Sequence, residues 1–458
     1  MNVLEFLNKA DFYLWNTVLI YLLLGVGIFL TIKLKGMQVR YLWLSLRMAF
    51  TRQDKKAQGD ISQFQSLMTA LAATIGIGSI AGMATAIISG GFGAIFWMWV
   101  VAFIGMVTKY AEAILAVKFR IVDKRNQMAG GPMYYIGSGL NLKWLGGLFA
   151  LFGIFAAFGG GNLIQSQSIS DAMSELINIP PYITGIIVAV LSGFVILGGI
   201  KSLGSVNAYL VPIMALIYII GGLIIIFLRY DHILSGLALI FRSALSPKAA
   251  LGGLLGTSVM SAMQMGIARG ISSNEAGLGS SPIASAAAKT DLPGRQALIS
   301  MSGVFLSSFV VCTITVLVLC VTDVVGLRTG SGELLNGSPL VMRAFSSVIP
   351  YGEYIVAIGL VLFGFSTILG WAYYGEKCFE YIFKEKYIIY FRIFFIFITF
   401  LGAISSIQIV WPIADIMNGL MAFPNLVGLL LLSGVVVKES EIFFEVLKRE
   451  KLDKKSKR

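Results

Sequence analysis

The chain has 458 residues, of which 57% are hydrophobic and only 13% are charged. A soluble domain of this size needs more charge to cover its surface, so the composition excludes a large soluble domain. The net charge of +12 could attract nucleic acid, but the basic residues lie in connections between apolar runs, where they indicate topology. The sequence therefore predicts a multi-pass protein of the lipid bilayer that binds no nucleic acid.

About eleven apolar runs are long enough to cross roughly 30 Å of hydrocarbon. They cover residues 13–32, 62–88, 94–117, 144–172, 182–200, 208–228, 251–273, 299–321, 354–379, 388–404 and 409–437. The basic connection from Lys33 to Lys56 and the basic tail from Lys448 to Arg458 belong in the cytoplasm by the positive-inside rule. We therefore expect an all-α protein of the plasma membrane with its N-terminus outside and its C-terminus inside.

Without the first run, ten runs remain, and they divide into two sets of five with opposite orientation. Opposite orientation is the geometry of an inverted repeat. We therefore predict an extra N-terminal helix with its basic connection (residues 1–58), a first repeat (59–230), a second repeat (231–437) and a basic cytoplasmic tail (438–458). The first helix of each repeat should be broken near the middle of the membrane.

The segment Ala72–Ser79 (AATIGIGS) places two glycines in the middle of a predicted span. Irregular backbone at membrane depth is tolerated where it lines a cavity or is packed in protein. A break here leaves free N–H groups from Gly76 to Gly78, which suit a carboxylate. It also leaves free carbonyls at Ala72 and Ile75, which suit a small monovalent cation. Helix packing through small residues is the alternative interpretation.

The second repeat offers two places for the matching break. One is Gln264–Ile267, where a glutamine and a glycine lie near mid-span, and the other is Gly277–Ser280 (GLGS), which resembles Gly76–Ser79. A break at Gly277 would leave a first half-helix of more than about twenty residues, too long for half a bilayer. We therefore predict the break at Gln264–Ile267 and interpret Asn274–Lys289 as a cytoplasmic gate or loop helix.

Other polar residues within the apolar runs add to the predicted site. Ser366 and Thr367 supply neighbouring hydroxyls for a cation, although such hydroxyls also bond back to the preceding turn. Trp371 lies one turn beyond Thr367 and should limit the volume of a substrate cavity. Asn162 and Gln165 place two amides on one helix face, where they either line a cavity or join helices.

Charged residues are scarce in the spans, and the exceptions are Lys109, Glu112, Arg269, Glu275 and Asp415. Membrane charges pair or serve function, and we expect mutual pairing near helix ends or gates. One histidine and three scattered cysteines exclude a zinc site or a Cys/His nucleophile. The sequence thus gives an enzyme no support.

Four longer motifs resemble those of the alanine/glycine:cation symporter family. They are Gly90–Trp99 (GGFGAIFWMW), Ala129–Ile136 (AGGPMYYI), Ser273–Ser280 (SNEAGLGS) and Asn418–Leu426 (NGLMAFPNL), spread over nearly the whole chain. The resemblance implies a fold similar to the leucine-transporter class of the amino acid–polyamine–cation superfamily, with one extra N-terminal helix. It also implies sodium-coupled import of small neutral amino acids such as alanine, glycine and serine.

The resemblance assigns substrate and sodium contacts to the broken helix and to its polar neighbours. The predicted substrate-binding residues are Thr74, Gly76, Ile77, Gly78, Asn162, Gln165, Gln264, Ile267 and Trp371, and the predicted sodium-binding residues are Ala72, Ile75, Phe363, Ser366 and Thr367. The chain departs from the family pattern at Ile77 and Ser79, where family members usually have Thr and Asn. These departures remove two polar side chains beside the carboxylate and beside any second ion.

The sequence therefore predicts a symporter that carries a small neutral amino acid with Na⁺ by alternating access and functions as a monomer. A sodium-independent exchanger and a proton-coupled transporter of the same fold are the nearest alternatives. A channel should show continuous polar pore helices, and an intramembrane enzyme needs a nucleophile and a base; the sequence shows neither. A ligand sensor without net transport is a further alternative.

Overall fold

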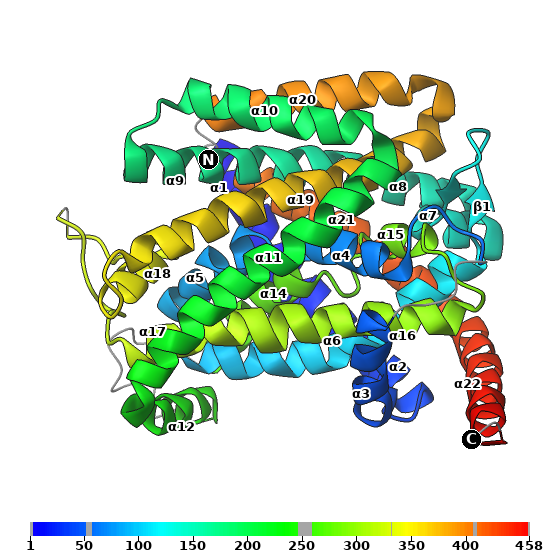
Figure 1. The fold of residues 1–458 in the computed structure, drawn as a ribbon, viewed down its shortest axis with the longest axis horizontal. Coiled ribbons are helices and arrows are strands. Elements are labelled where there is room, and N and C mark those ends of the chain that lie inside the picture. The colour runs from blue at the N-terminus through cyan, green and yellow to red at the C-terminus, as the bar shows by residue number, and fades with distance from the viewer. Residues whose placement is uncertain (1–2, 52–56, 246–258, 331, 406–409, 457–458) are drawn as a thin grey trace.

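The computed structural model describes residues 3–51, 57–245, 259–330, 332–405 and 410–456, which form helices, connecting loops and one short β hairpin (Figure 1). Eight of the described helices are long and apolar enough to cross a membrane, and two shorter apolar helices accompany them. The prediction of an all-α membrane protein is confirmed. The number of spans stays a prediction, because a span that is broken or contains a polar stretch does not form one long apolar helix.

The N-terminal region and the first half of the chain contain α1 (Val3–Tyr13), the π-helical turn η1 (Leu14–Leu19), α2 (Ile20–Lys33), α3 (Met37–Phe50), α4 (Gln63–Thr74), the 3₁₀ turn η2 (Ile77–Ser79), α5 (Ala81–Gly90), α6 (Gly93–Lys118), β1 (Ile121–Val122), β2 (Met128–Ala129), α7 (Pro132–Tyr134), η3 (Tyr135–Gly139), α8 (Lys143–Phe158), η4 (Gly159–Leu163), α9 (Ile164–Ile177), α10 (Pro181–Leu197) and α11 (Gly199–Leu228). The strands β1 and β2 are antiparallel and pair Ile121 with Ala129.

The second half contains η5 (Tyr230–His232), α12 (Ile233–Leu245), α14 (Val259–Asn274), α15 (Pro282–Ala286), α16 (Pro293–Val304), the π-helical η6 (Phe305–Cys312), α17 (Thr313–Val321), α18 (Gly337–Ser346), α19 (Gly352–Phe383), η7 (Glu385–Tyr387), α20 (Ile388–Ile404), α21 (Val410–Leu431) and α22 (Ser433–Ser456). The long helices run along the long axis of the molecule, with α18 and α12 at one end and β1 and α22 at the other (Figure 1). We refer to these as the α18 end and the α22 end.

The predicted break in the first repeat is confirmed. Helix α4 begins with a capping box at Ser62 and ends at Thr74, after which Gly76 is extended (φ −106°, ψ −163°). The short turn η2 follows, and then the chain becomes helical again as α5. A β-carbon at Gly76 would lie only 2.7 Å from the Thr367 hydroxyl, so glycine is what allows α19 to approach the break.

The predicted break at Gln264–Ile267 is wrong, because α14 runs unbroken from Val259 to Asn274. Its glycine, Gly266, serves close packing: a β-carbon there would lie 2.0 Å from the Ala94 carbonyl oxygen on α6. The break follows Asn274 instead, and α15 resumes the helix at Pro282. The Asn274–Lys289 stretch is therefore the break and its second half-helix, not a cytoplasmic loop.

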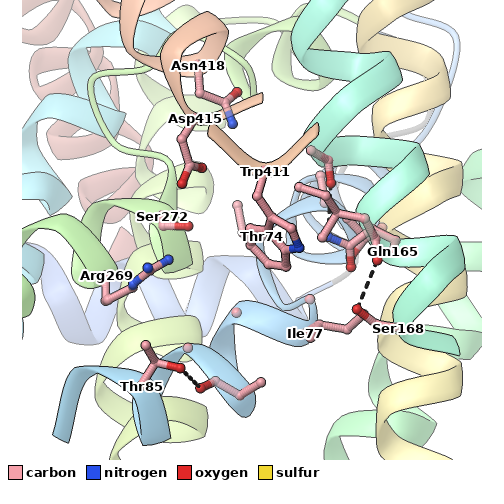
Figure 2. Close-up of a pocket in the computed structure, with 18 of the residues that line it drawn as sticks. Thr74, Ile77, Thr85, Gln165, Ser168, Arg269, Ser272, Trp411, Asp415 and Asn418 are labelled. Carbon is pink, nitrogen blue, oxygen red and sulfur yellow. Dashed lines mark hydrogen bonds between the residues drawn. The ribbon is translucent and has the colours of Figure 1, made fainter. Parts of the chain in front are cut away.

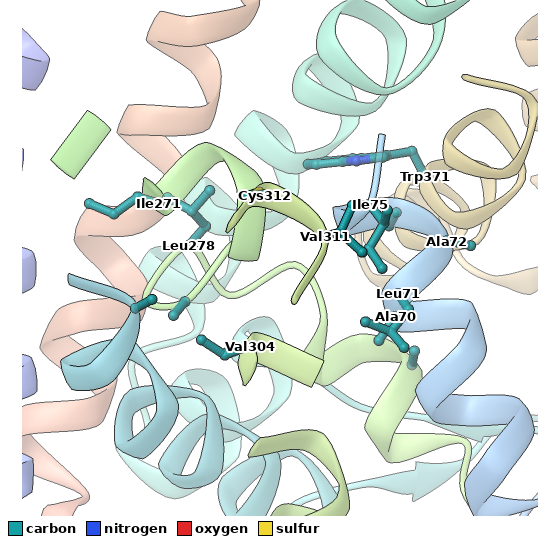
Figure 3. Packing of buried hydrophobic residues seen from close by; sticks show 14 of the residues in the cluster. Ala70, Leu71, Ala72, Ile75, Ile271, Leu278, Val304, Val311, Cys312 and Trp371 are labelled. Carbon is teal, nitrogen blue, oxygen red and sulfur yellow. The ribbon is translucent and has the colours of Figure 1, made fainter. Parts of the chain in front are cut away.

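The length argument failed because a half-helix longer than half a bilayer does precede the break; residues 246–258 lie outside the described part of the chain. The described half-helix has 16 residues, about 24 Å at 1.5 Å per residue. The local signal was the glycine pair, since Gly277 (φ 88°) and Gly279 (φ 83°) adopt left-handed conformations that other residues rarely reach. Apolar side chains such as Ile271 and Leu278 pack around this break, as Leu71 and Ile75 do at the first (Figure 3).

Two charged side chains of the neighbouring helix α6, Glu112 and Lys109, stabilise the second break. One carboxylate oxygen of Glu112 accepts hydrogen bonds from the N–H groups of Gly277 (3.0 Å) and Gly279 (3.1 Å) and from the Asn425 amide (2.6 Å). The Lys109 ammonium donates to the Asn274 carbonyl at 2.7 Å. Each charged side chain thus binds main-chain groups that have lost their helical partners at the break. We had expected the two side chains to pair with each other instead.

Replacing Glu112 by leucine should therefore destabilise the fold. Three buried donors would lose their acceptor, at a cost of about 1–3 kcal/mol for each unsatisfied group. We expect E112L to lower the thermal unfolding midpoint of the purified protein by several degrees. E112Q keeps one acceptor oxygen and should shift the midpoint less; equal midpoints for E112L and wild type would contradict this role of Glu112.

Candidate functional site

A cavity of about 400 Å³ opens beside the first break and is bounded by α4, α5, α9, α14, α19 and α21. Figure 2 shows Arg269 and Ser272 on one wall and Gln165 on the opposite wall, with Asp415 above them and Ile77 below. Of the predicted substrate-binding residues, the cavity is lined by Thr74, Gly76, Ile77, Gly78, Gln165 and Trp371. The first break thus lines a cavity, as the sequence predicted.

Three residues of the break that line this cavity, Gly76, Ile77 and Gly78, have main-chain N–H groups without a protein acceptor among the described residues. In the described part of the chain, no hydrogen bond is donated by the N–H of Gly76, Ile77 or Gly78, whereas the next two N–H groups bond back to Gly76 and Ile77. Free N–H groups at the start of a helical segment carry partial positive charge and bind anions such as carboxylates.

Gln165 supplies a polar side chain opposite the break. Its amide nitrogen donates to the Gly160 carbonyl at 3.0 Å, while its amide oxygen is buried and has no partner among the described residues. This oxygen would lie 3.5 Å from a β-carbon on Gly76. A buried acceptor that lacks a donor is costly, so the position suits a ligand that brings an N–H group.

Four oxygens of α4 and α19 meet on the other side of the break. The Thr367 hydroxyl lies 3.0 Å from the Ala72 carbonyl and 2.8 Å from the Phe363 carbonyl. The Ser366 hydroxyl lies 3.4 Å and 3.0 Å from the same two carbonyls. Neutral oxygen donors at such spacing suit a hard monovalent cation, and Ile75, where α4 ends, lies within one turn of Ala72.

Other predicted residues lie elsewhere. Asn162 is fully buried, and its amide donates to the Phe395 carbonyl at 2.8 Å, so it joins η4 to α20. Ile267 is buried in the core, and Gln264 is partly buried on α14. None of these three side chains is among the described residues that line the cavity. The observed contact of Asn162 thus agrees with the alternative interpretation, in which this amide joins two helices.

The sequence analysis did not assign the charged residues of the cavity to the site. Arg269 and Glu275 come from α14 and its break, and Asp415 comes from α21. Glu275 accepts a hydrogen bond from the Ser280 hydroxyl at 2.5 Å. Within the described residues, neither Arg269 nor Asp415 has an oppositely charged atom within 4.0 Å. The sequence signal for these residues was a charged side chain inside an apolar run. Such a residue either pairs with another charge or belongs to a functional site.

The cavity reaches toward the α18 end, because Gly337 and Ser338 at the start of α18 form part of its wall. The opposite end is sealed. The guanidinium of Arg120 donates to the carbonyls of Ala286 (3.0 Å), Ala288 (2.7 Å) and Gln58 (3.0 Å). It thereby joins the start of the first broken helix to the end of the second.

A layer of ion pairs extends this seal to α19. Arg125 lies 3.1 Å from Asp123 and 2.9 Å from Glu380, and Lys377 lies 2.8 Å from Glu380. Burial works against the charged form of Asp123, but the Gln127 main-chain N–H, Lys377 and Arg125 outweigh it and lower the pKa of this carboxyl. Asp123 therefore stays ionised at neutral pH.

Comparison with known proteins identifies the family. The model of the sodium:alanine symporter family matches residues 1–457. The chain belongs to the sodium:alanine symporter family. The chain is also 52% identical over 456 residues to the sodium/alanine symporter AgcS of Methanococcus maripaludis, covering 98% of this chain and 99% of that one. The family assignment agrees with the four motifs found in the sequence.

Solved structures agree on the fold. A crystal structure of MhsT in complex with L-phenylalanine matches with a TM-score of 0.58 and 15% identity, covering 84% of this chain and 93% of that one. A substrate-bound, outward-open Na⁺-coupled sialic acid symporter matches with a TM-score of 0.54 and 15% identity, covering 92% and 87%. The chain therefore has the leucine-transporter-type fold that its sequence predicted.

Proposed function

We propose that this protein imports small neutral amino acids together with sodium by alternating access. The observation that carries the proposal is the first break, which presents three free N–H groups on the cavity side and carbonyl oxygens on the side of Ser366 and Thr367. An anion and a cation can therefore bind to one stretch of backbone, only a few residues apart. Membership of a family of sodium:alanine symporters supports the same assignment.

In the proposed complex, the amino-acid carboxylate binds the N–H groups from Gly76 to Gly78, and its ammonium binds the free oxygen of Gln165. Sodium binds the oxygens of Ala72, Ile75, Phe363, Ser366 and Thr367. Each ligand orders the same break, so each raises the affinity of the other, with a coupling of roughly 1–3 kcal/mol in typical cases. This linkage explains how a sodium gradient can drive uptake.

The position of Trp371 favours a substrate with a small side chain. Its indole lines the cavity, and a β-carbon on Gly161 would lie 2.3 Å from the Trp371 β-carbon, so the ring is packed tightly against η4. A fixed indole beside the carboxylate position leaves room for a short side chain, such as that of alanine, glycine or serine.

The sidedness follows from the basic connections. If the basic tail on α22 is cytoplasmic, the α18 end is extracellular, the N-terminus is outside, and the cavity faces outward in this structure. The seal made by Arg120 is then the inner gate, and transport requires it to open. We place the protein in the plasma membrane, where it functions as a monomer.

A proton-coupled transporter of the same fold is the second candidate, and Asp415 favours it. This carboxylate lines the cavity and has no cation within 4.0 Å among the described residues, so a proton is one way to neutralise it. A proton gradient without sodium would then drive uptake.

The test is uptake of radiolabelled alanine into proteoliposomes. We expect accumulation with an inward sodium gradient and little with an equal choline gradient. Uptake driven by a pH gradient in choline would favour proton coupling. Exchange that no gradient drives would indicate a sodium-independent exchanger, and binding without accumulation would indicate a sensor.

Removing the Thr367 hydroxyl should weaken the sodium site. T367V keeps the shape of the side chain but removes one of the clustered oxygens, so we expect the sodium concentration for half-maximal uptake to rise about tenfold, equivalent to about 1.4 kcal/mol. T399V is the matched control, because Thr399 bonds back to Phe395 at 3.0 Å on α20 in the same way. An equal effect of both variants would place the sodium elsewhere.

Shortening Trp371 should widen the range of substrates. W371A removes the indole that lines the cavity, so larger neutral amino acids such as leucine should compete with labelled alanine several-fold better than in wild type. W99A is the control, because Trp99 donates to Thr313 at 2.9 Å and lies outside the cavity wall. Unchanged competition in W371A would mean that another residue limits substrate size.

A further inference from the structure

Helix α3 has an outer face that the transport site does not use. In Figure 1 it runs crosswise to α6 and α16, the long helices it packs against, as a helix lying in the plane of a membrane surface would. It lies toward the α22 end, where the sealing contacts are. Its 14 residues extend about 21 Å, too short to cross a bilayer.

The two faces of α3 differ in composition and in contacts. On the inner face, Ser45 is buried and donates to the Leu298 carbonyl of α16 at 2.5 Å, and the ring of Tyr41 stacks on Phe444 of α22 with centroids 4.2 Å apart. On the outer face, Val39 is 68% exposed, Trp43 80% and Phe50 63%. These three project within about 40° of one another at 100° per residue, which makes one apolar stripe.

Basic residues flank this stripe on one side. Arg40 and Arg47 are both exposed and lie about 40–60° beyond Trp43 around the helix. Lys33 and Lys35 precede the helix, and within the described residues α3 carries no acidic side chain. An apolar stripe beside cationic groups on a surface-lying helix matches the interface of a bilayer, with the stripe among acyl chains and the arginines at phosphates.

We infer that α3 is a membrane-surface helix that binds anionic phospholipid, with Val39, Trp43 and Phe50 in the leaflet and Arg40 and Arg47 on the headgroup. The occupant is a lipid because the apolar stripe and the cationic flank lie side by side, as the two ends of one phospholipid require. The contact of Ser45 with Leu298 holds the inner face of α3 against α16, so the outer face is left for the lipid.

The experiment reads lipid contact at Trp43 directly. The full chain is reconstituted with phosphatidylcholine or phosphatidylglycerol bearing brominated acyl chains, which quench nearby tryptophan, and the quenching lost in W43F is the Trp43 contribution. We expect Trp43 to be quenched in both lipids and to show a severalfold preference for phosphatidylglycerol in mixtures. R40Q/R47Q should abolish most of that preference, since each basic residue near an anionic surface contributes about fivefold.

R343Q is the matched control, because Arg343 is an exposed arginine on α18 at the opposite end, and it should leave the preference unchanged. Absence of quenching at Trp43 would overturn the membrane placement of α3. Quenching without preference for phosphatidylglycerol, or a preference that R40Q/R47Q retains, would overturn the headgroup site. The readout requires no transport, so it is independent of the proposed function.

Discussion

Backbone that leaves the helix inside a membrane must find partners for its N–H and C=O groups, because the hydrocarbon offers none. This protein has two such stretches and treats them differently. At the second break the partners are built in, since Glu112 accepts from Gly277 and Gly279 and Lys109 donates to Asn274. At the first break the N–H groups from Gly76 to Gly78 face a cavity with no described acceptor. The second break is therefore held by the scaffold, whereas the first keeps free N–H groups, to which we propose that the substrate binds.

The asymmetry explains why the two breaks need different neighbours. Glu112 and Asn425 come from helices outside the second break and fix its shape. The first break is approached by hydroxyls and amides, which can bind a transient ligand and release it. Thr367 contacts Ala72 at 3.0 Å, and Gln165 keeps a free oxygen toward the cavity.

The sequence was informative where a local signal had one physical meaning. Glycines in an apolar run predicted the break at Gly76, and the oxygens of Ser366 and Thr367 were predicted near Ala72, where they are found. The second break was predicted at the wrong glycine, because the length argument outweighed the resemblance of Gly277–Ser280 to Gly76–Ser79. Only the structure shows that Gly266 packs against Ala94 while Gly277 adopts a positive φ. Asn162 shows the same ambiguity, since an amide in a span can face either a cavity or a neighbouring helix.

Arg120 has a consequence for speed that is separate from recognition. In the proposed cycle, opening the α22 end must detach one guanidinium from three carbonyls, that of Gln58 before the first broken helix and those of Ala286 and Ala288 at the end of the second. That step is the same whichever amino acid occupies the cavity at the far side of the seal, and it is the same when the cavity is empty. If the proposed cycle holds, substrate preference depends on residues of the cavity and turnover on residues of the seal, so evolution can retune one without disturbing the other.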